Sequence, residues 1–137
     1  MTAADEWRDL ARRCREAPGP DREINLALAR SIDAVVMWQK DGCAAQEYTH
    51  WHFTGSIDDI VTLIEKTLPG YDWRVGKCPI DGADKYDAQL YHEDDAKDTD
   101  ADASSPALAL CTAYCEARAA VEDAACVNGT AAEREMP

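Results

Sequence analysis

The chain has 137 residues, 46% of them hydrophobic, and its 27 acidic and 14 basic residues give a formal net charge of −13. This length fits one domain with its own core, and the periodic apolar positions argue against a disordered chain. The excess of acid disfavours direct binding to nucleic acid, and no apolar run approaches the roughly 20 residues that span a bilayer.

Residues 5–16 carry apolar side chains at helical spacing, which predicts an amphipathic helix. After a break at residues 18–20, Asp21 is a suitable N-cap for a second helix, and we expect the two helices to form a hairpin. Residues 33–53 leave two alternatives open. Their apolar part, residues 34–38, fits a short buried strand or a continuation of the second helix.

The most regular apolar stripe predicts a helix that begins after Ser56 and ends before Gly70. Alternating apolar residues over 71–76 and 86–92 then predict two antiparallel strands with one buried face.

Residues 93–105 are interpreted as an acidic connector. Ser104 or Ser105 then caps a last helix, which we expect to run from Pro106 to about Val127, with Gly129 as its stop. An alanine-rich surface allows this helix to pack closely on the strands.

The order of these elements predicts an α+β fold in which helices pack on a small, mainly antiparallel sheet, as a helix/sheet/helix layered sandwich. We expect a single domain over residues 1–130 and a C-terminal tail over 131–137.

Three segments carry a resemblance to a known family: DLARRC…GPDREINLALA, YTHWHFTGSIDDIVTLIEKTLPGYDWRV and SSPALALCTAYCEARAA. In this order and spacing, over about residues 9–120, they resemble the small phage and prophage proteins of the phage ABA-sandwich family. The resemblance implies a helix–sheet–helix fold and a viral origin. That family supplies no catalytic residues to carry over, and this chain departs from its pattern at residues 50–53 and in the acidic connector.

The six cysteines bear on the compartment in which the chain acts. Its N-terminus is charged from the fifth residue and lacks the apolar core of a secretory signal, so we expect the protein in the host cytoplasm, with reduced thiols. Cys111 and Cys115 lie four residues apart on one face of the last helix, which predicts that they pack in the core.

No residues form a complete catalytic or metal-binding pattern. Cys43, His50 and His52 are close in sequence but lack the paired cysteines typical of zinc sites. Residues 98–102 imitate the start of a calcium loop, yet its sixth and twelfth positions are Ala103 and Ala109. Phosphate-binding glycine loops are also absent. We therefore expect a binding protein rather than an enzyme, without a metal or cofactor.

Acidic residues are concentrated in residues 81–102, where nine acids and two bases give −7. We expect this region to dock on a basic surface of a host protein, of the kind that holds nucleic acid, and so to act as a phage counter-defence inhibitor. Six residues are the candidates for this contact: Glu93, Asp94, Asp95, Asp98, Asp100 and Asp102.

The spacing of these acids limits that interpretation. On an extended chain, Asp98, Asp100 and Asp102 lie about 6.6 Å apart. One such row is too sparse to imitate a nucleic-acid duplex, so Asp87 and neighbouring acids would have to supply a second row. The alternative is a solvated loop that aids solubility.

A second candidate binding segment is His50-Trp51-His52. A purely structural role is one interpretation: two histidines face the solvent around a buried aromatic residue. Together with other aromatic residues, the segment also suggests an alternative function, the sequestration of a nucleotide-type small molecule in a pocket between helix and sheet. An accessory or structural phage protein is a further alternative. The oligomeric state is left open.

Overall fold

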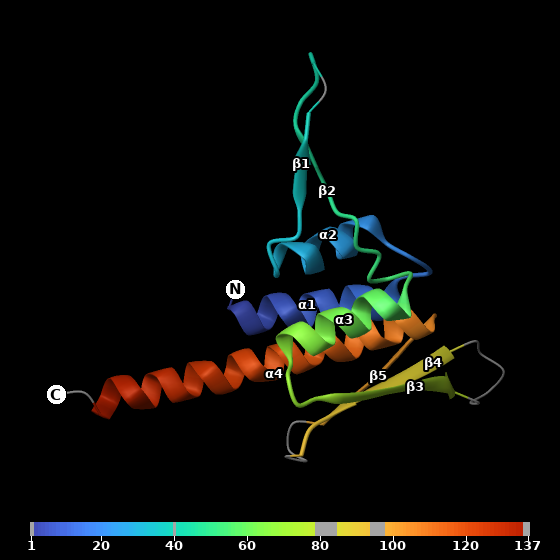
Figure 1. The fold of residues 1–137 in the computed structure, drawn as a ribbon. Helices are drawn as coiled ribbons and strands as arrows, with labels where there is room; N and C mark the ends of the chain where they lie inside the picture. The colour runs from blue at the N-terminus through green and yellow to red at the C-terminus, as the bar shows by residue number, and fades with distance from the viewer. Residues whose placement is uncertain (1, 40, 79–84, 94–97, 136–137) are drawn as a thin grey trace.

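The computed structural model describes residues 2–39, 41–78, 85–93 and 98–135, with side chains up to residue 125 except that of residue 78. Its elements in chain order are α1 (Ala3–Glu16), α2 (Arg22–Arg30), β1 (Val36–Trp38), β2 (Gln46–Tyr48), α3 (Ile57–Thr67), β3 (Asp72–Cys78), β4 (Lys85–Tyr91), β5 (Thr99–Ala103) and α4 (Pro106–Glu135). The two sheets, β1-β2 and β3-β4-β5, are antiparallel, so the α+β prediction is confirmed (Figure 1). No described helix is long and apolar enough to cross a membrane.

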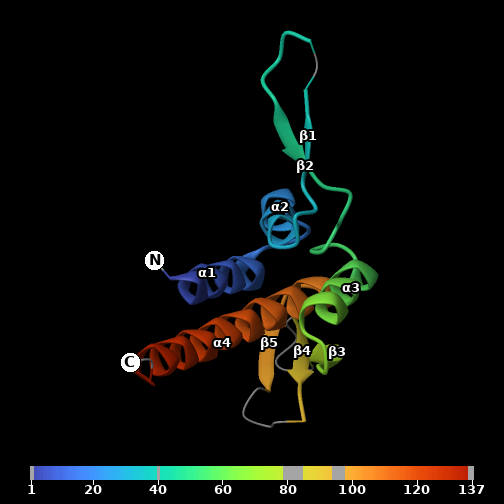
Figure 2. The ribbon, with the colours of Figure 1, turned by 60° about the vertical axis from the view of Figure 1, so that its left-hand side comes forward.

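Helix α4 is the centre of the core. It lies across the three-stranded sheet, with α1 and α3 beside it (Figures 1 and 2). Buried alanines such as Ala109, Ala113 and Ala117 let neighbouring elements approach closely, as the sequence predicted. Leu108 and Tyr114, both fully buried, fill the remaining space.

Two predictions about the helices are wrong. The main helical partner of α1 is α4 rather than α2, so the first two helices do not form the expected hairpin. Helix α4 also continues through Gly129 to Glu135. One glycine costs a helix only about 1 kcal/mol, which does not stop a helix flanked by alanines.

The expected starts of the second, third and last helices are confirmed. Asp21 accepts a hydrogen bond from the Ile24 amide (3.0 Å) and caps α2. Ser56 accepts a hydrogen bond from the Asp59 amide and caps α3. At the start of α4, the Ser105 hydroxyl accepts a hydrogen bond from the Leu108 amide at 3.2 Å. These caps fix where each helix begins.

Residues 34–48 form a projecting hairpin, here called the β1–β2 arm. Helix α2 ends in a turn at Asp33, whose φ of 55° redirects the chain. Of the two alternatives for residues 34–38, the strand is correct, since residues 36–38 form β1. The expectation that this strand is buried is wrong, because Val36, Met37 and Trp38 are 40%, 61% and 49% exposed. The arm stands away from the helices in both ribbon views (Figures 1 and 2).

The expected strand pair is confirmed as β3 and β4, in a register that places Trp73 opposite Leu90 and Val75 opposite Ala88. The interpretation of residues 93–105 as a connector is wrong over residues 99–103, which form edge strand β5. This strand pairs with β4 and buries Ala101 and Ala103. Two small apolar residues between aspartates are too weak a pattern to predict a strand.

A buried polar network joins α2 to the loop before α3. Thr54 is fully buried, and its hydroxyl accepts a hydrogen bond from the Asp21 amide (2.8 Å) and donates to the Asn25 side chain (2.8 Å). The Thr54 amide also donates to Asn25 at 2.9 Å. This network holds the base of the β1–β2 arm against the core.

Candidate functional site

The β3-β4-β5 sheet has one packed face and one open face. Ala88, Leu90, Ala101 and Ala103 point toward α4 and are buried, whereas the alternate residues point away from it. In Figures 1 and 2 the labelled helices lie on one side of this sheet. The side chains of the open face belong to Asp72, Arg74, Lys85, Asp87, Gln89, Tyr91, Asp100 and Asp102.

Pairing of β5 with β4 brings the acids of these two strands side by side. Asp102 is the Cα partner of Asp87, and Asp100 is the partner of Gln89. Opposite residues of antiparallel strands have Cα atoms about 4.5–5.5 Å apart, and alternate residues along a strand about 6.6 Å. Asp87 is thus one acid beside the row of β5, whereas Asp72 on β3 lies opposite Tyr91, four residues along β4 from Asp87.

The basic residues near this face neutralise only part of it. Asp102 has the Arg15 and Lys85 cations at 3.9 Å each, and Arg74 donates to the Gln89 side chain at 2.7 Å. Within the described residues, Asp87 and Asp100 form no ion pair. Both residues are exposed.

The predicted acidic residues do not all lie on this face. Asp100 and Asp102 do, whereas Asp98 precedes β5 and accepts a hydrogen bond from the His92 amide at 3.1 Å. Glu93 is exposed beyond the end of β4. Asp94 and Asp95 lie outside the described residues.

The His50-Trp51-His52 segment lies on the other side of the helices, at the foot of the β1–β2 arm. The Tyr48 ring contacts His50 edge to face at 5.2 Å, and Trp51 stacks on buried Phe53 at 5.5 Å. Lys66 lies 5.8 Å above the Trp51 ring. His52, which is exposed, donates its amide to Asp59. The acidic face and this segment are thus separate candidates.

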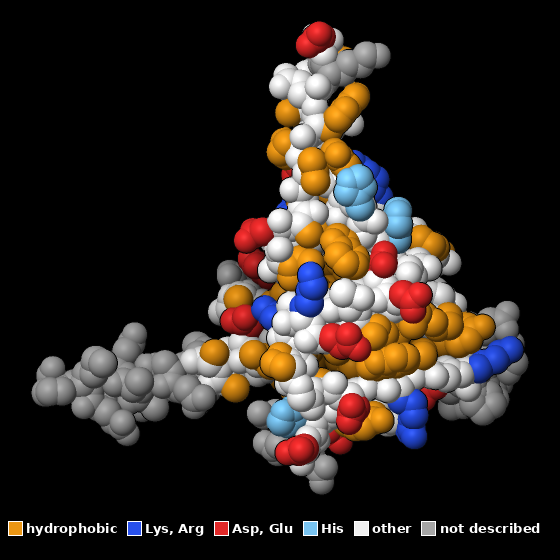
Figure 3. Space-filling view, in the orientation of Figure 1, with side chains coloured by type: hydrophobic (Ala, Val, Ile, Leu, Met, Phe, Trp, Pro, Cys, Tyr) orange, Lys and Arg blue, Asp and Glu red, His pale blue; other side chains and the backbone are white. Residues whose placement is uncertain are grey.

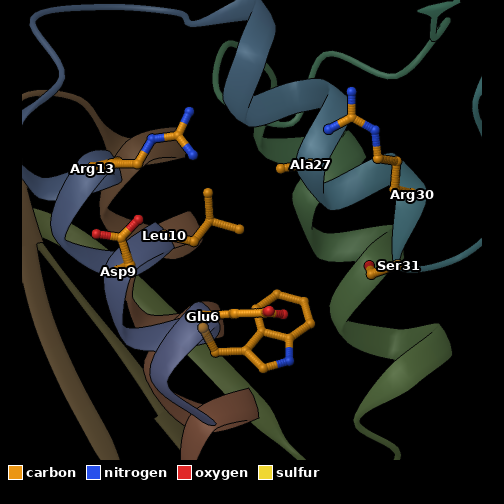
Figure 4. A pocket seen from close by; sticks show the side chains of 8 residues that line it. Glu6, Asp9, Leu10, Arg13, Ala27, Arg30 and Ser31 are labelled. Carbon is orange, nitrogen blue, oxygen red and sulfur yellow. The ribbon is translucent and has the colours of Figure 1, made fainter. Parts of the chain in front are cut away.

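Two hollows lie near α2. Trp51 and His52 line one of about 310 Å³ beside the N-terminus of α2, together with Arg22. The other, of about 440 Å³, separates α1 from α2, and Leu10 points across it toward Ala27 (Figure 4). Neither lies between a helix and the sheet, which is where the sequence placed an aromatic pocket.

Three cysteines form a buried cluster between α1 and α4. Cys14, Cys111 and Cys115 are fully buried free thiols, and the Cys111 thiol donates to the Phe53 carbonyl oxygen at 3.2 Å. Burial raises the pKa of Cys111 and Cys115 well above the usual thiol value. Hydrogen bonds from these two thiols lower the pKa of Cys14. The predicted core packing of Cys111 and Cys115 is confirmed.

Cys43, by contrast, is exposed in the loop of the arm. Among the described residues, no group of three or more His, Cys, Asp or Glu side chains has the arrangement of a metal site.

Comparisons with protein-family models, with curated proteins and with solved structures find no match to this chain. The resemblance to phage ABA-sandwich proteins therefore rests on the motifs quoted above. Asp87 is expected from the sequence only as a member of a possible second row, and Asp72 is not among the residues named there. Strand alternation did indicate that both point away from the core.

Proposed function

We propose that the chain is a protein-binding domain that docks the open acidic face of its three-stranded sheet on a basic surface of a host protein. The observation that carries this proposal is the register that sets Asp87 opposite Asp102 and places Asp100 along the same edge. These three carboxylates form an acidic cluster on the sheet. The proposed docking involves no catalytic step.

Geometry and charge support a partner that normally holds nucleic acid. Asp100 and Asp102 lie about 6.6 Å apart along β5, and Asp87 lies about 5 Å across from Asp102. This charge spacing is closer to that of a phosphate backbone than a single row of acids would be. The charge of −13 also steers a basic partner during diffusional encounter. In the phage context that the resemblance implies, such docking in the host cytoplasm would block a defence protein.

The proposal is tested by separating the effect of the face from that of overall charge. One variant carries Asp72→Asn, Asp87→Asn and Asp100→Asn. A matched control carries Glu6→Gln, Asp58→Asn and Glu65→Gln, which removes the same charge from exposed helix positions. The probe is a fluorescent lysine-rich peptide, followed by capture of partners from host lysate with each variant.

The proposal requires that the face variant loses most of its affinity for the peptide and most captured protein, while the control stays near the wild type. Binding of the wild type should also weaken steeply with salt, since exposed charges are screened over about 8 Å at physiological ionic strength. Equal losses in the two variants would show that only net charge matters and would overturn the proposal.

One observation favours the small-molecule alternative: Trp51 and His52 line the same hollow as Arg22, beside the N-terminus of α2. These groups suit an anionic ligand with a planar ring. Against it, Phe53 already covers one face of the Trp51 ring. Calorimetric titration with purine and pyrimidine nucleotides, on the wild type and on Trp51→Ala, distinguishes the two functions, because sequestration requires tight binding that the variant loses.

A further inference from the structure

The β1–β2 arm exposes apolar side chains on both of its faces. Val36, Met37 and Trp38 are consecutive, and each is at least 40% exposed. Together they leave about 300 Å² of mostly apolar surface in solvent, given ~150–250 Å² for a large side chain. Apolar side chains of the arm stand clear of the body in Figure 3. Patches of this size often mark interaction sites.

The arm also has an unpaired strand edge. Sheet β1-β2 has two strands, and among the described residues no third strand pairs with β1. The outer edge of β2 is less free, because the Glu47 carbonyl accepts a hydrogen bond from Arg22 at 2.8 Å. An isolated two-stranded hairpin is marginally stable in water, and a third strand or a packed face stabilises it. The free edge is therefore that of β1, which carries the exposed apolar residues.

The base of the arm is fixed to the body. The Arg30 guanidinium binds both carboxylate oxygens of Glu47 (2.9 and 3.2 Å), and these hydrogen bonds lower the pKa of Glu47. Thr49 donates to the Ala34 carbonyl at 3.1 Å and closes the foot of the hairpin. The strand edge is thus held in place, which reduces the entropy lost when another chain pairs with it.

Charge indicates what can approach this edge. The arm (residues 34–48) contains one lysine, Asp41 and Glu47, and Glu47 is paired with Arg30, so the arm is nearly neutral in a chain whose total is −13. The acidic sheet face lies at the opposite end of the molecule (Figures 1 and 2). Two copies that meet through their arms therefore bring their neutral parts together and keep their acidic faces far apart.

We infer that the arm is a homodimerisation element, in which β1 of one copy pairs antiparallel with β1 of a second copy. A two-fold axis through the strand centre sets each Met37 opposite its counterpart and each Val36 opposite Trp38 of the other copy. The result is a four-stranded sheet, β2-β1-β1-β2, with both inner edges paired.

The area predicts the strength of this dimer. Edge pairing buries the β1 backbone edge and the facing sides of the three apolar side chains of each copy, while their outer sides stay in solvent, so the interface is smaller than the ~1,000 Å² of a small specific interface. We therefore expect a weak, reversible dimer with a dissociation constant on the order of 100 micromolar.

Sedimentation velocity of the full chain over low to high micromolar concentrations tests this inference. The wild type should shift from a species of 15.1 kDa to one of twice that mass, and Met37→Ser/Trp38→Ser should remain monomeric. Trp73→Ser is the matched control, because Trp73 is also exposed (37%) but lies on β3, and it should dimerise like the wild type. Thermal melts verify that both variants fold.

Salt separates this dimer from docking by the acidic face. Salt screens the repulsion between two acidic copies, so the dimer should hold or tighten as salt rises. The Asp72, Asp87 and Asp100 face variant should still dimerise, whatever becomes of its partner binding. A wild type that stays monomeric at every concentration would overturn the inference. So would an arm variant that dimerises like the wild type, or a dimer that salt dissolves.

Discussion

Asp102 on β5 lies directly opposite Asp87 on β4, so that two carboxylates face each other across the antiparallel pair. Like charges at such a position destabilise a sheet. Arg15 and Lys85, each 3.9 Å from Asp102, offset part of this repulsion, but Asp87 has no ion pair within the described part of the chain. Folding alone does not favour an aspartate at residue 87.

Replacing Asp87 by Asn should therefore raise stability and weaken binding at once. The change removes one of the two facing charges and keeps the side-chain size, so we expect a gain of about 0.2–1 kcal/mol in the free energy of unfolding. Urea denaturation measures the gain, and affinity for the lysine-rich peptide should fall in the same variant. A loss of stability would mean that Asp87 has a structural partner.

Thr54→Val tests the network between α2 and the loop before α3. Valine matches threonine in shape but leaves the Asp21 amide and Asn25 without their hydroxyl partner, at a cost of about 1–3 kcal/mol. Thr54→Ser keeps the hydroxyl and should lose less. If the two variants melt at the same temperature, the hydroxyl contributes little and packing of the methyl group dominates.

Glu116 gives a prediction with a defined pH dependence. Burial raises the pKa of this carboxyl, and the nearby charge of Arg15 opposes the shift. A carboxyl group whose pKa is higher in the folded than in the unfolded state stabilises the fold at pH values below its unfolded-state pKa. This stabilisation is lost as the pH rises through the folded-state pKa.

Glu116→Gln should accordingly be slightly more stable than the wild type at pH 7, by at most about 0.5 kcal/mol, since glutamine still accepts from Arg15. The advantage should vanish below about pH 4, where the wild-type carboxyl is protonated in both states. Thermal melts from pH 3 to pH 8 measure the difference. A less stable variant at neutral pH would show that the ion pair with Arg15 outweighs the cost of burial.

The cysteines should differ sharply in reactivity. A thiol reagent should modify Cys43 at once in the native protein, because it is exposed, and should reach Cys14, Cys111 and Cys115 only on unfolding. Cys43→Ser provides the control for the fast phase. Freshly lysed cells should yield six free thiols under denaturing, non-reducing conditions, and a smaller number would contradict the expected reducing compartment.

The sequence predicted the parts of the fold whose patterns are local. Capping residues and apolar stripes located α2 and α3, and alternation located β3 and β4. Helix α4 runs past Gly129 because helix length depends on the whole flanking segment and not on one weak residue.

The parts that escaped prediction depend on partners distant in sequence. Strand β5 contributes only Ala101 and Ala103 to the core, and aspartate is rare in strands, so nothing local marks it. Without β5, the position of Asp102 opposite Asp87 cannot be foreseen, and the acidic residues appear as a loop. The β1–β2 arm has no buried face, so it has no apolar periodicity to detect.

The arm and the open acidic face lie at opposite ends of the molecule, with the helices between them. Occupation of one end therefore leaves the other sterically free. The inferred dimer, joined through its arms, would carry two copies of the proposed docking face directed outward and would bind bivalently. For a partner that has two basic sites at a matching span, the second contact forms at an effective concentration on the order of millimolar. Avidity then retains the complex even where each single contact is weak.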